Sequence, residues 1–203
     1  MKSTILKFKG LGLFLSLTLL LSLCRLACPD VAQWEEWFQI NVDGFGNSDN
    51  LNTETMITYN GKLYAGTRND TAGAGVWEYD GMGWTQVNTS GFGDTNNWWV
   101  QGMAVYGGSL YVGTHNSATG AEVWVYDGTN WSGNSPGFSP NNTSIDSMAV
   151  YDDGTGDKLY VGTYNSAAGA EVWEYDGTYW NEKDIVGFST NYTCAVSMAV
   201  YNT

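Results

Sequence analysis

Three residues of unlike chemistry occupy one position of a repeated tripeptide. Arg68, His115 and Tyr164 each follow a threonine and precede an asparagine. A guanidinium, an imidazole and a phenol could line the rim of one site, because an active centre usually brings unlike groups together. His115 is the only histidine of the chain, and the sequence offers it no partner for acid–base work. We therefore interpret His115 as an exposed loop residue and predict no catalytic residue.

The asparagine of this tripeptide does not vary. It stands at Asn69, Asn116 and Asn165. It could supply one polar ligand contact per repeat, or it could close a turn by hydrogen-bonding the backbone through its side-chain amide. The turn is the favoured interpretation, and the ligand contact stays open.

Two adjacent tryptophans, Trp98 and Trp99, break the repeat in another loop. Their rings could stack on a sugar or an aromatic partner, although burial beneath the loop is the favoured interpretation. Glu122 and Glu171 recur, and paired carboxylates can hydrolyse glycosides at defined separations. Because they occupy equivalent segments of separate repeats, we expect them at the surface or at strand edges.

A run of acidic residues lengthens one turn at Asp152, Asp153 and Asp157. Carboxylate oxygens are the ligands that calcium prefers, so a weak calcium site is one interpretation of this turn. The spacing does not match the EF-hand loop. We predict no other metal and no cofactor.

The segments that carry these residues are near-duplicates. Residues 120–131 read GAEVWVYDGTNW, and residues 169–180 read GAEVWEYDGTYW. The equivalent tryptophans Trp77, Trp124 and Trp173 lie 47 and 49 residues apart. A period of about 47 residues is typical of repeat architectures such as solenoids and propellers.

Each repeat contains four short segments rich in Val, Tyr, Trp and Thr, separated by Gly, Asn and Asp, which predicts strands. In the second repeat they span 103–106, 110–114, 122–127 and 130–134. The connections Gly107-Gly108 and Asp127-Gly128 suit tight hairpin turns, so neighbouring strands should be antiparallel. Apolar residues on both faces of the third segment indicate a sheet covered on both sides. These features predict an all-β fold, a β-propeller of four-stranded antiparallel blades.

The pattern resembles kelch and related bacterial propeller repeats over residues 34–203. The resemblance lies in the Tyr-Asp-Gly turn followed by Trp131, and in the glycine that ends the second segment, Gly113. Kelch repeats have a double glycine there, whereas Gly113 is followed by Thr114. The resemblance is therefore at the level of the superfamily.

The two ends of the repeat region contain partial repeats. Residues 37–46 match a fourth segment with its following loop, and residues 198–201 match a first segment. About three and a half blades are present, which makes an incomplete ring. We expect the chain to be the N-terminal part of a longer protein, with open-ended assembly between chains as the alternative.

Residues 1–28 have the layout of a secretory signal peptide. Three lysines precede an apolar run at 11–23, which Arg25 ends. The run is shorter than the roughly 20 residues of a membrane span, so we predict none. Cys24 or Cys28 could carry a lipid anchor, although simple cleavage is favoured. We expect a bacterial protein that is secreted, periplasmic or attached to the cell surface.

The charge balance excludes one class of partner. Without residues 1–28 the chain has four basic and 21 acidic residues, a net charge of −17. Such a protein repels phosphate backbones, so we exclude nucleic-acid binding. Cys194 is the only cysteine beyond the signal region, so no internal disulfide can form after cleavage, and its thiol is either buried and free or paired with a partner outside these residues.

Function is expected on the long loops. The loops at 68–75, 115–121 and 164–170 should lie on the same side as those at 91–100 and 137–146, and binding residues concentrate on such loops. We predict a binding module for a glycan or an extracellular protein. The alternatives are a glycan lyase or hydrolase with its catalytic residues in further blades, and a structural or adhesive repeat protein. The candidate ligand-binding residues are Arg68, Asn69, Trp98, Trp99, His115, Asn116, Tyr164 and Asn165.

Overall fold

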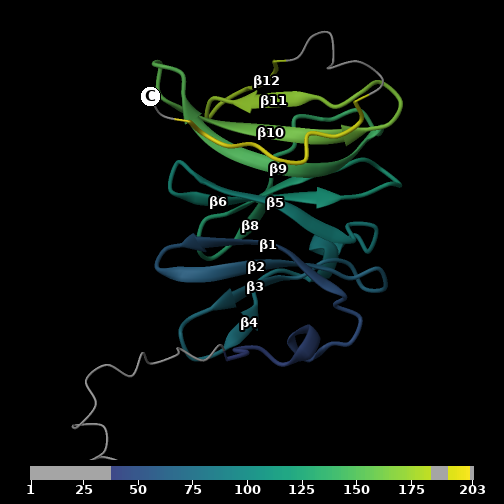
Figure 1. Ribbon diagram of the computed structural model, residues 1–203, viewed down its shortest axis with the longest axis vertical. Helices are drawn as coiled ribbons and strands as arrows, with labels where there is room; N and C mark the ends of the chain where they lie inside the picture. Colours follow the sequence, from purple (N-terminus) through teal and green to yellow (C-terminus); the bar gives the residue numbers. More distant parts are fainter. Residues whose placement is uncertain (1–37, 184–191, 202–203) are drawn as a thin grey trace, which may run out of the picture. The chain divides into compact units, whose positions relative to one another are not determined.

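The computed structural model describes residues 38–183 and 192–201, and every element lies in the compact unit that begins at Gln39. The predicted signal peptide, with Cys24 and Cys28, is outside the described residues. The fold is all-β: twelve strands form one antiparallel sheet that does not close, accompanied by two short 3-10 helices (Figure 1). In the described part of the chain, no helix combines the length and apolar character that crossing a bilayer requires.

The strands follow one another as three four-stranded meanders, which we call repeats 1, 2 and 3 (Figure 1). Repeat 1 contains β1 (Asn52–Tyr59), β2 (Lys62–Arg68), β3 (Val76–Tyr79) and β4 (Trp84–Gln86). Repeat 2 contains β5 (Trp99–Tyr106), β6 (Ser109–His115), β7 (Val123–Tyr126) and β8 (Trp131–Gly133). Repeat 3 contains β9 (Asn142–Asp152), β10 (Asp157–Asn165), β11 (Val172–Tyr175) and β12 (Trp180–Glu182).

The tight connections within each repeat use the residues that the sequence offers for them. Asn60 and Gly61, which join β1 to β2, both have positive φ, at 48° and 74°. Gly107 and Gly108, which join β5 to β6, also have positive φ, at 56° and 80°. Two consecutive residues of this kind match the right-handed twist of a hairpin, so the antiparallel order predicted from the turns is confirmed.

A glycine in the second strand lets consecutive repeats approach closely. A Cβ atom at Gly66 would lie 2.4 Å from the Cγ1 atom of Val100, and one at Gly113 would lie 2.4 Å from the Cγ2 atom of Ile145. Val100 and Ile145 are fully buried residues of the first strand in the next repeat. Any side chain larger than hydrogen at these glycines would hold the two repeats apart.

Aromatic rings hold each repeat against the loop that precedes it. Phe92, in η2 (Ser90–Gly93), stacks on Trp124 at 4.9 Å and meets Trp131 edge-on at 5.0 Å. The Nε1 atom of Trp131 donates to the backbone oxygen of Val87, just beyond β4, at 2.8 Å. Phe45 of η1 (Asp43–Gly46) likewise stacks on Trp77 and meets Trp84 edge-on, whereas Phe138 meets both Trp173 and Trp180 edge-on.

Tyrosines cover the opposite faces of neighbouring repeats. Tyr59 and Tyr64 of repeat 1 pack against Tyr126 of repeat 2, with ring centroids 6.3 and 6.2 Å away. Tyr111 packs in the same way against Tyr175 of repeat 3 at 6.1 Å, and burial raises its pKa to about 12. Both faces of the intervening sheets are therefore covered, as the apolar third segments predict.

The two partial repeats differ from expectation. Of the fourth strand and following loop expected at residues 37–46, the described residues 38–42 contain no strand, and Asp43–Gly46 form η1; no third strand is described beside them. Residues 198–201, expected as a first strand, also lack strand structure. The segment 192–201 makes one isolated bridge, between Tyr164 and Cys194, and it is joined to repeat 3 by backbone hydrogen bonds of Tyr192, Thr193 and Ala195. The expectation of a buried free thiol is wrong, because Cys194 is exposed.

Candidate functional site

The unlike residues of the repeated tripeptide lie in one line across the sheet. Arg68 is paired with Trp99, and His115 with Ser144; these two pairs are also the bridges that join the three repeats. Residues directly opposite each other in an antiparallel sheet point to the same face. The line continues through further pairs in the neighbouring strands, and we call it the row. Its members, in order, are Asn52, Arg68, Trp99, His115, Ser144, Tyr164 and Cys194.

At one end of the row, Arg68 is held by a carboxylate and an indole. Its Nε and Nη2 atoms donate to the two carboxylate oxygens of Asp70 at 2.8 and 2.7 Å. Its guanidinium carbon lies 4.6 Å from the centre of the Trp99 ring, a cation–π contact. The hydrogen bonds from Arg68 lower the pKa of Asp70, and that carboxylate raises the pKa of Arg68. The positive charge of the row is therefore compensated within the protein.

In the middle of the row, His115 lies between two indoles. Its ring centroid is 4.7 Å from that of Trp99 and 5.7 Å from that of Trp98. Burial lowers the pKa of His115, although the nearby carboxylate of Asp146 opposes this effect. The Nδ1 atom is buried and has no hydrogen-bond partner among the described residues. The expectation of an exposed loop residue is wrong: His115 is half-buried at the end of β6, because the two indoles cover it.

A β-bulge brings further polar groups to the row. The first strand of every repeat contains an extra residue at the equivalent place, which leaves Glu54, Gln101 and Asp146 without a cross-strand partner. Bulges of this kind redirect a side chain and recur near functional sites. The Oγ atom of Ser144 donates to the Oε1 atom of Gln101 at 2.5 Å, and Asn52 donates to Glu54 at 2.9 Å.

The sequence interpretation missed these three bulge residues and the row positions Asn52, Ser144 and Cys194. A signal was present, because the three bulge residues each lie immediately before the Thr-Met, Gly-Met or Ser-Met pair of a first strand. Alignment alone could not show that they approach the tripeptide residues, since that proximity depends on how one repeat joins the next.

Trp98 lies beside the row and stays half-buried. Its backbone N–H donates to the oxygen of His115 at 3.1 Å, and its own oxygen accepts from the N–H of Asn69 at 2.8 Å. Among the described residues its ring contact is with His115. Trp99, in contrast, has Arg68 and His115 against its ring. Of the two indoles, Trp98 is the better placed to stack on a ligand.

The repeated asparagines lie below the surface. Asn69, Asn116 and Asn165 are 2%, 0% and 1% exposed. In each case the Oδ1 atom accepts from the backbone N–H groups two and three residues ahead; for Asn116 these are Ala118 and Thr119, both at 3.0 Å. These contacts agree with the turn interpretation, in which the asparagine shapes the loop and does not reach a ligand.

The repeated glutamates also serve the fold. The Oε2 atom of Glu122 accepts from Trp124 Nε1 at 2.8 Å and from Asn97 Nδ2 at 3.0 Å. Glu171 makes the equivalent contacts with Trp173 and Asn142, at 2.9 and 2.7 Å. Because Asn97 also accepts a backbone hydrogen bond from Ala74 of repeat 1, each glutamate helps to fix one repeat on the next.

The acidic turn between β9 and β10 is closed by its own carboxylates. The Oδ1 atom of Asp152 accepts from the N–H groups of Gly154 and Gly156, both at 2.8 Å. Asp153 pairs with Lys158 at 2.6 Å, and this hydrogen bond lowers the pKa of Asp153 to about 2. Over 38–183 and 192–201, no three His, Cys, Asp or Glu side chains gather in a way that could hold a metal ion.

Every basic residue in the described ranges takes part in an ion pair. The shortest contacts run from 2.6 to 2.8 Å, and the bases are Lys62, Arg68, Lys158 and Lys183. An anionic ligand would have to break one of these pairs on a chain whose formal net charge is −13. The site therefore suits a ligand without negative charge.

No protein-family model matches this chain, and no curated protein matches its sequence.

Proposed function

We propose that this chain is a secreted or cell-surface binding module of the kelch-like β-propeller kind, which recognises an uncharged glycan along the row. The observation that carries the proposal is the row itself, in which all three repeats contribute unlike side chains to one face of the sheet. The signal-peptide layout of residues 1–28 supports export.

The propeller part of the proposal is supported by the packing between repeats. Each repeat is a four-stranded antiparallel meander, and the same Phe, Trp and Tyr contacts recur from one repeat to the next. Sheets of this kind that cover one another's faces, with short outer edges, are the building blocks of propellers.

Binding is favoured over catalysis by the surroundings of His115. Nucleophilic or acid–base catalysis needs a base within hydrogen-bond reach of a nucleophile, oriented by a third group. The imidazole of His115 instead contacts the rings of Trp98 and Trp99, and within 38–183 and 192–201 its Nδ1 atom has no hydrogen-bond partner. The row offers hydrogen-bonding and stacking groups without a catalytic pair.

A glycan suits the mixture of groups along the row. The amide of Asn52 and the hydroxyl of Tyr164 can both donate and accept, as sugar hydroxyls do, whereas Ser144 is buried and its hydroxyl donates to Gln101. The half-buried rings of Trp98 and Tyr164 provide apolar surface with a polar edge, which suits the C–H face of a sugar. An acidic glycan is disfavoured, because the single arginine of the row is already paired with Asp70.

A glycan array with neutral, acidic and basic members tests the proposal. We expect the purified chain to bind neutral oligosaccharides, and Trp98→Ala or Tyr164→Ala to weaken that binding about tenfold, the effect of losing roughly 1.4 kcal/mol of stacking. Tyr179→Ala is the matched control, because Tyr179 is 69% exposed on the turn between β11 and β12. Circular dichroism confirms that each variant is folded.

The proposal fails if no glycan binds, or if the two row variants bind as well as the control. Binding confined to acidic glycans would retain the binding module but overturn the choice of an uncharged ligand.

A further inference from the structure

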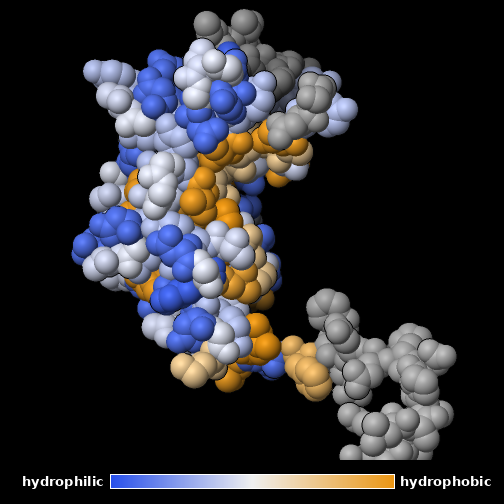
Figure 2. All heavy atoms as spheres, turned by 90° about the vertical axis from the view of Figure 1, so that its left-hand side faces the viewer, coloured by the Kyte–Doolittle hydropathy of each residue, from blue (hydrophilic) through white to orange (hydrophobic). Residues whose placement is uncertain are grey.

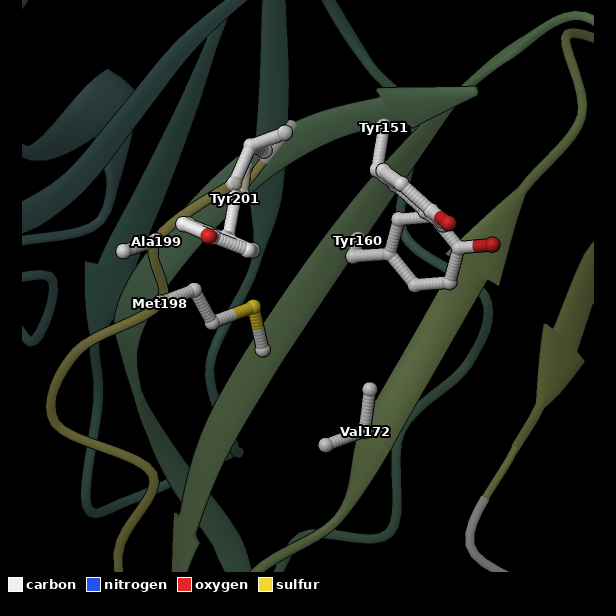
Figure 3. A pocket seen from close by; sticks show the side chains of 8 residues that line it. Tyr151, Tyr160, Val172, Met198, Ala199 and Tyr201 are labelled. Carbon is white, nitrogen blue, oxygen red and sulfur yellow. The ribbon is translucent and has the colours of Figure 1, made fainter. Parts of the chain in front are cut away.

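Apolar and hydrogen-bonding groups gather in different places on this protein. A pocket of about 390 Å³ on repeat 3 is lined by aromatic and aliphatic side chains, among them Tyr151, Tyr160 and Val172 (Figure 3). Hydrophobic side chains also form a band along one side of the protein (Figure 2). Polar groups that are open to a ligand lie instead beside the middle of the row, at two of the bulges. A ligand rich in hydroxyl groups is therefore better matched there than in the pocket.

Asp146, the bulge residue of β9, has a carboxylate without a hydrogen-bond donor among the described residues. The lysines and the arginine of the described ranges are paired with other carboxylates. Of the charges that act on His115, that of Asp146 has the largest effect, so the two side chains are neighbours. Burial lowers the pKa of His115, which leaves its imidazole uncharged at neutral pH. Asp146 is only half-buried, and its carboxylate can take a donor from a ligand.

Gln101, the bulge residue of β5, offers a free donor. Its Oε1 atom accepts from the Oγ atom of Ser144 at 2.5 Å, which fixes the amide, whereas its Nε2 atom has no acceptor among the described residues. A Cβ atom at Gly102 would lie 3.3 Å from the backbone oxygen of Ile145, so the residues next to the two bulges touch. The free donor of Gln101 and the free acceptor of Asp146 are therefore carried by neighbouring segments of repeats 2 and 3.

Trp98 adds an apolar surface beside these two groups. Its ring stacks on His115, the neighbour of Asp146, with centroids 5.7 Å apart. A sugar ring has an apolar C–H face and an edge of hydroxyl groups. An indole next to a carboxylate and an amide matches both parts, because the indole covers the face while the polar groups bind the edge.

We infer that Asp146, Gln101 and Trp98 form one sugar subsite of the row, which selects a neutral sugar with two adjacent free hydroxyl groups. The inference rests on the proposed function. Both hydroxyls donate to the carboxylate of Asp146, and one of them accepts from the Nε2 atom of Gln101. A cationic amine would satisfy Asp146 alone, because an ammonium group donates and cannot accept. A hydroxyl does both, so the two free groups together favour hydroxyls over a cation.

Calorimetric titration with oligosaccharides of defined linkage tests the subsite. Cellohexaose, maltohexaose and mannohexaose are neutral, and their inner units carry two adjacent free hydroxyls. Laminarihexaose is equally neutral, but its inner units lack such a pair. We expect at least one of the first three to bind the wild type about tenfold to a hundredfold more tightly than laminarihexaose, because hydrogen bonds to a carboxylate are lost with the latter. The hexamer of glucosamine serves as the cationic probe.

Asp146→Asn should weaken the preferred probe about tenfold and leave the binding of laminarihexaose unchanged, because the pair of acceptor oxygens is lost. Gln101→Glu keeps the acceptor for Ser144 but removes the free donor, so it should weaken the same probe. Asp157→Asn is the matched control. It removes the same charge from the exposed start of β10 and should bind like the wild type. Asp146→Asn should unfold at the same urea concentration as the wild type, since its carboxylate has no internal donor to lose.

The outcomes separate this subsite from the wider proposal. If Trp98→Ala weakens binding but Asp146→Asn and Gln101→Glu do not, the row binds glycans and the subsite is wrong. If no neutral hexasaccharide binds, the proposed function fails and the subsite fails with it. Tighter binding of the glucosamine hexamer, lost in Asp146→Asn, would overturn the choice of hydroxyls and make Asp146 part of a site for cations.

Discussion

The replacement Gly113→Ala tests how the repeats are joined. The added Cβ atom would lie 2.4 Å from Cγ2 and 2.6 Å from Cβ of Ile145, and 3.0 Å from Cε of Met148. Carbon atoms in contact normally lie about 3.5–4.0 Å apart, so repeats 2 and 3 must separate by about 1 Å or Ile145 must move. Ile145 is fully buried and has no room to do so.

We expect Gly113→Ala to lower the free energy of unfolding by about 2–3 kcal/mol, near the upper end for an overpacked core, because two backbone segments meet there. For a chain of this size the midpoint of thermal unfolding should fall by about 4–12 °C. Tryptophan fluorescence during urea unfolding measures the change.

Gly133→Ala is the matched control. Gly133 also lies in a strand of repeat 2, but a Cβ atom there would meet nothing within 4 Å. It should be neutral or stabilise by about 0.4–1 kcal/mol, because alanine restricts the unfolded chain. In a double-mutant cycle, Gly113→Ala and Ile145→Ala should cost less together than the sum of their separate effects. If Gly113→Ala and Gly133→Ala changed the free energy of unfolding equally, the close approach between repeats would be refuted.

Two further outcomes follow from the described contacts. Asn116→Ala removes the acceptor of the Ala118 and Thr119 N–H groups, so it should cost about 1–3 kcal/mol in urea unfolding and speed amide exchange in the loop at 115–121. Burial alone would raise the pKa of Glu174, but hydrogen bonds from Lys183 and Tyr160 lower it overall. A lowered carboxyl pKa contributes stability that is present above the unfolded pKa of about 4.3 and is lost as the pH falls through the folded pKa. Urea unfolding midpoints measured from about pH 6 to about pH 3 should show this loss of stability. Glu174→Gln should make the loss smaller.

The strands could be predicted from the sequence because their evidence is local. Alternation and turn residues such as Asn60 and Gly61 depend on neighbours in the chain, and these predictions agree with the structure. The glycine of the second strand could be recognised in the sequence as a repeated residue, but the contact that requires a glycine there could not. Gly113 is required by Ile145, which lies 32 positions later and meets it only when two repeats pack.

The candidate site was predicted only in part. Arg68, His115 and Tyr164 could be found by comparing repeats, because each differs from its equivalents. Their alignment with Ser144 and Cys194 depends on cross-strand pairing between repeats, which the sequence does not record. The half-buried state of His115 likewise depends on tertiary contacts, since one covering indole, Trp98, immediately precedes β5 and the other, Trp99, is its first residue.

Oxidative footprinting of the aromatic side chains, with and without the neutral oligosaccharide that binds best on the array, tests the central claim most directly. If the row is the binding site, the ligand should protect Trp98 and Tyr164 from oxidation and leave Met82 and Tyr179, on the tight turns, unchanged. Unaltered oxidation of Trp98 and Tyr164, or protection confined to the tight turns, would contradict it.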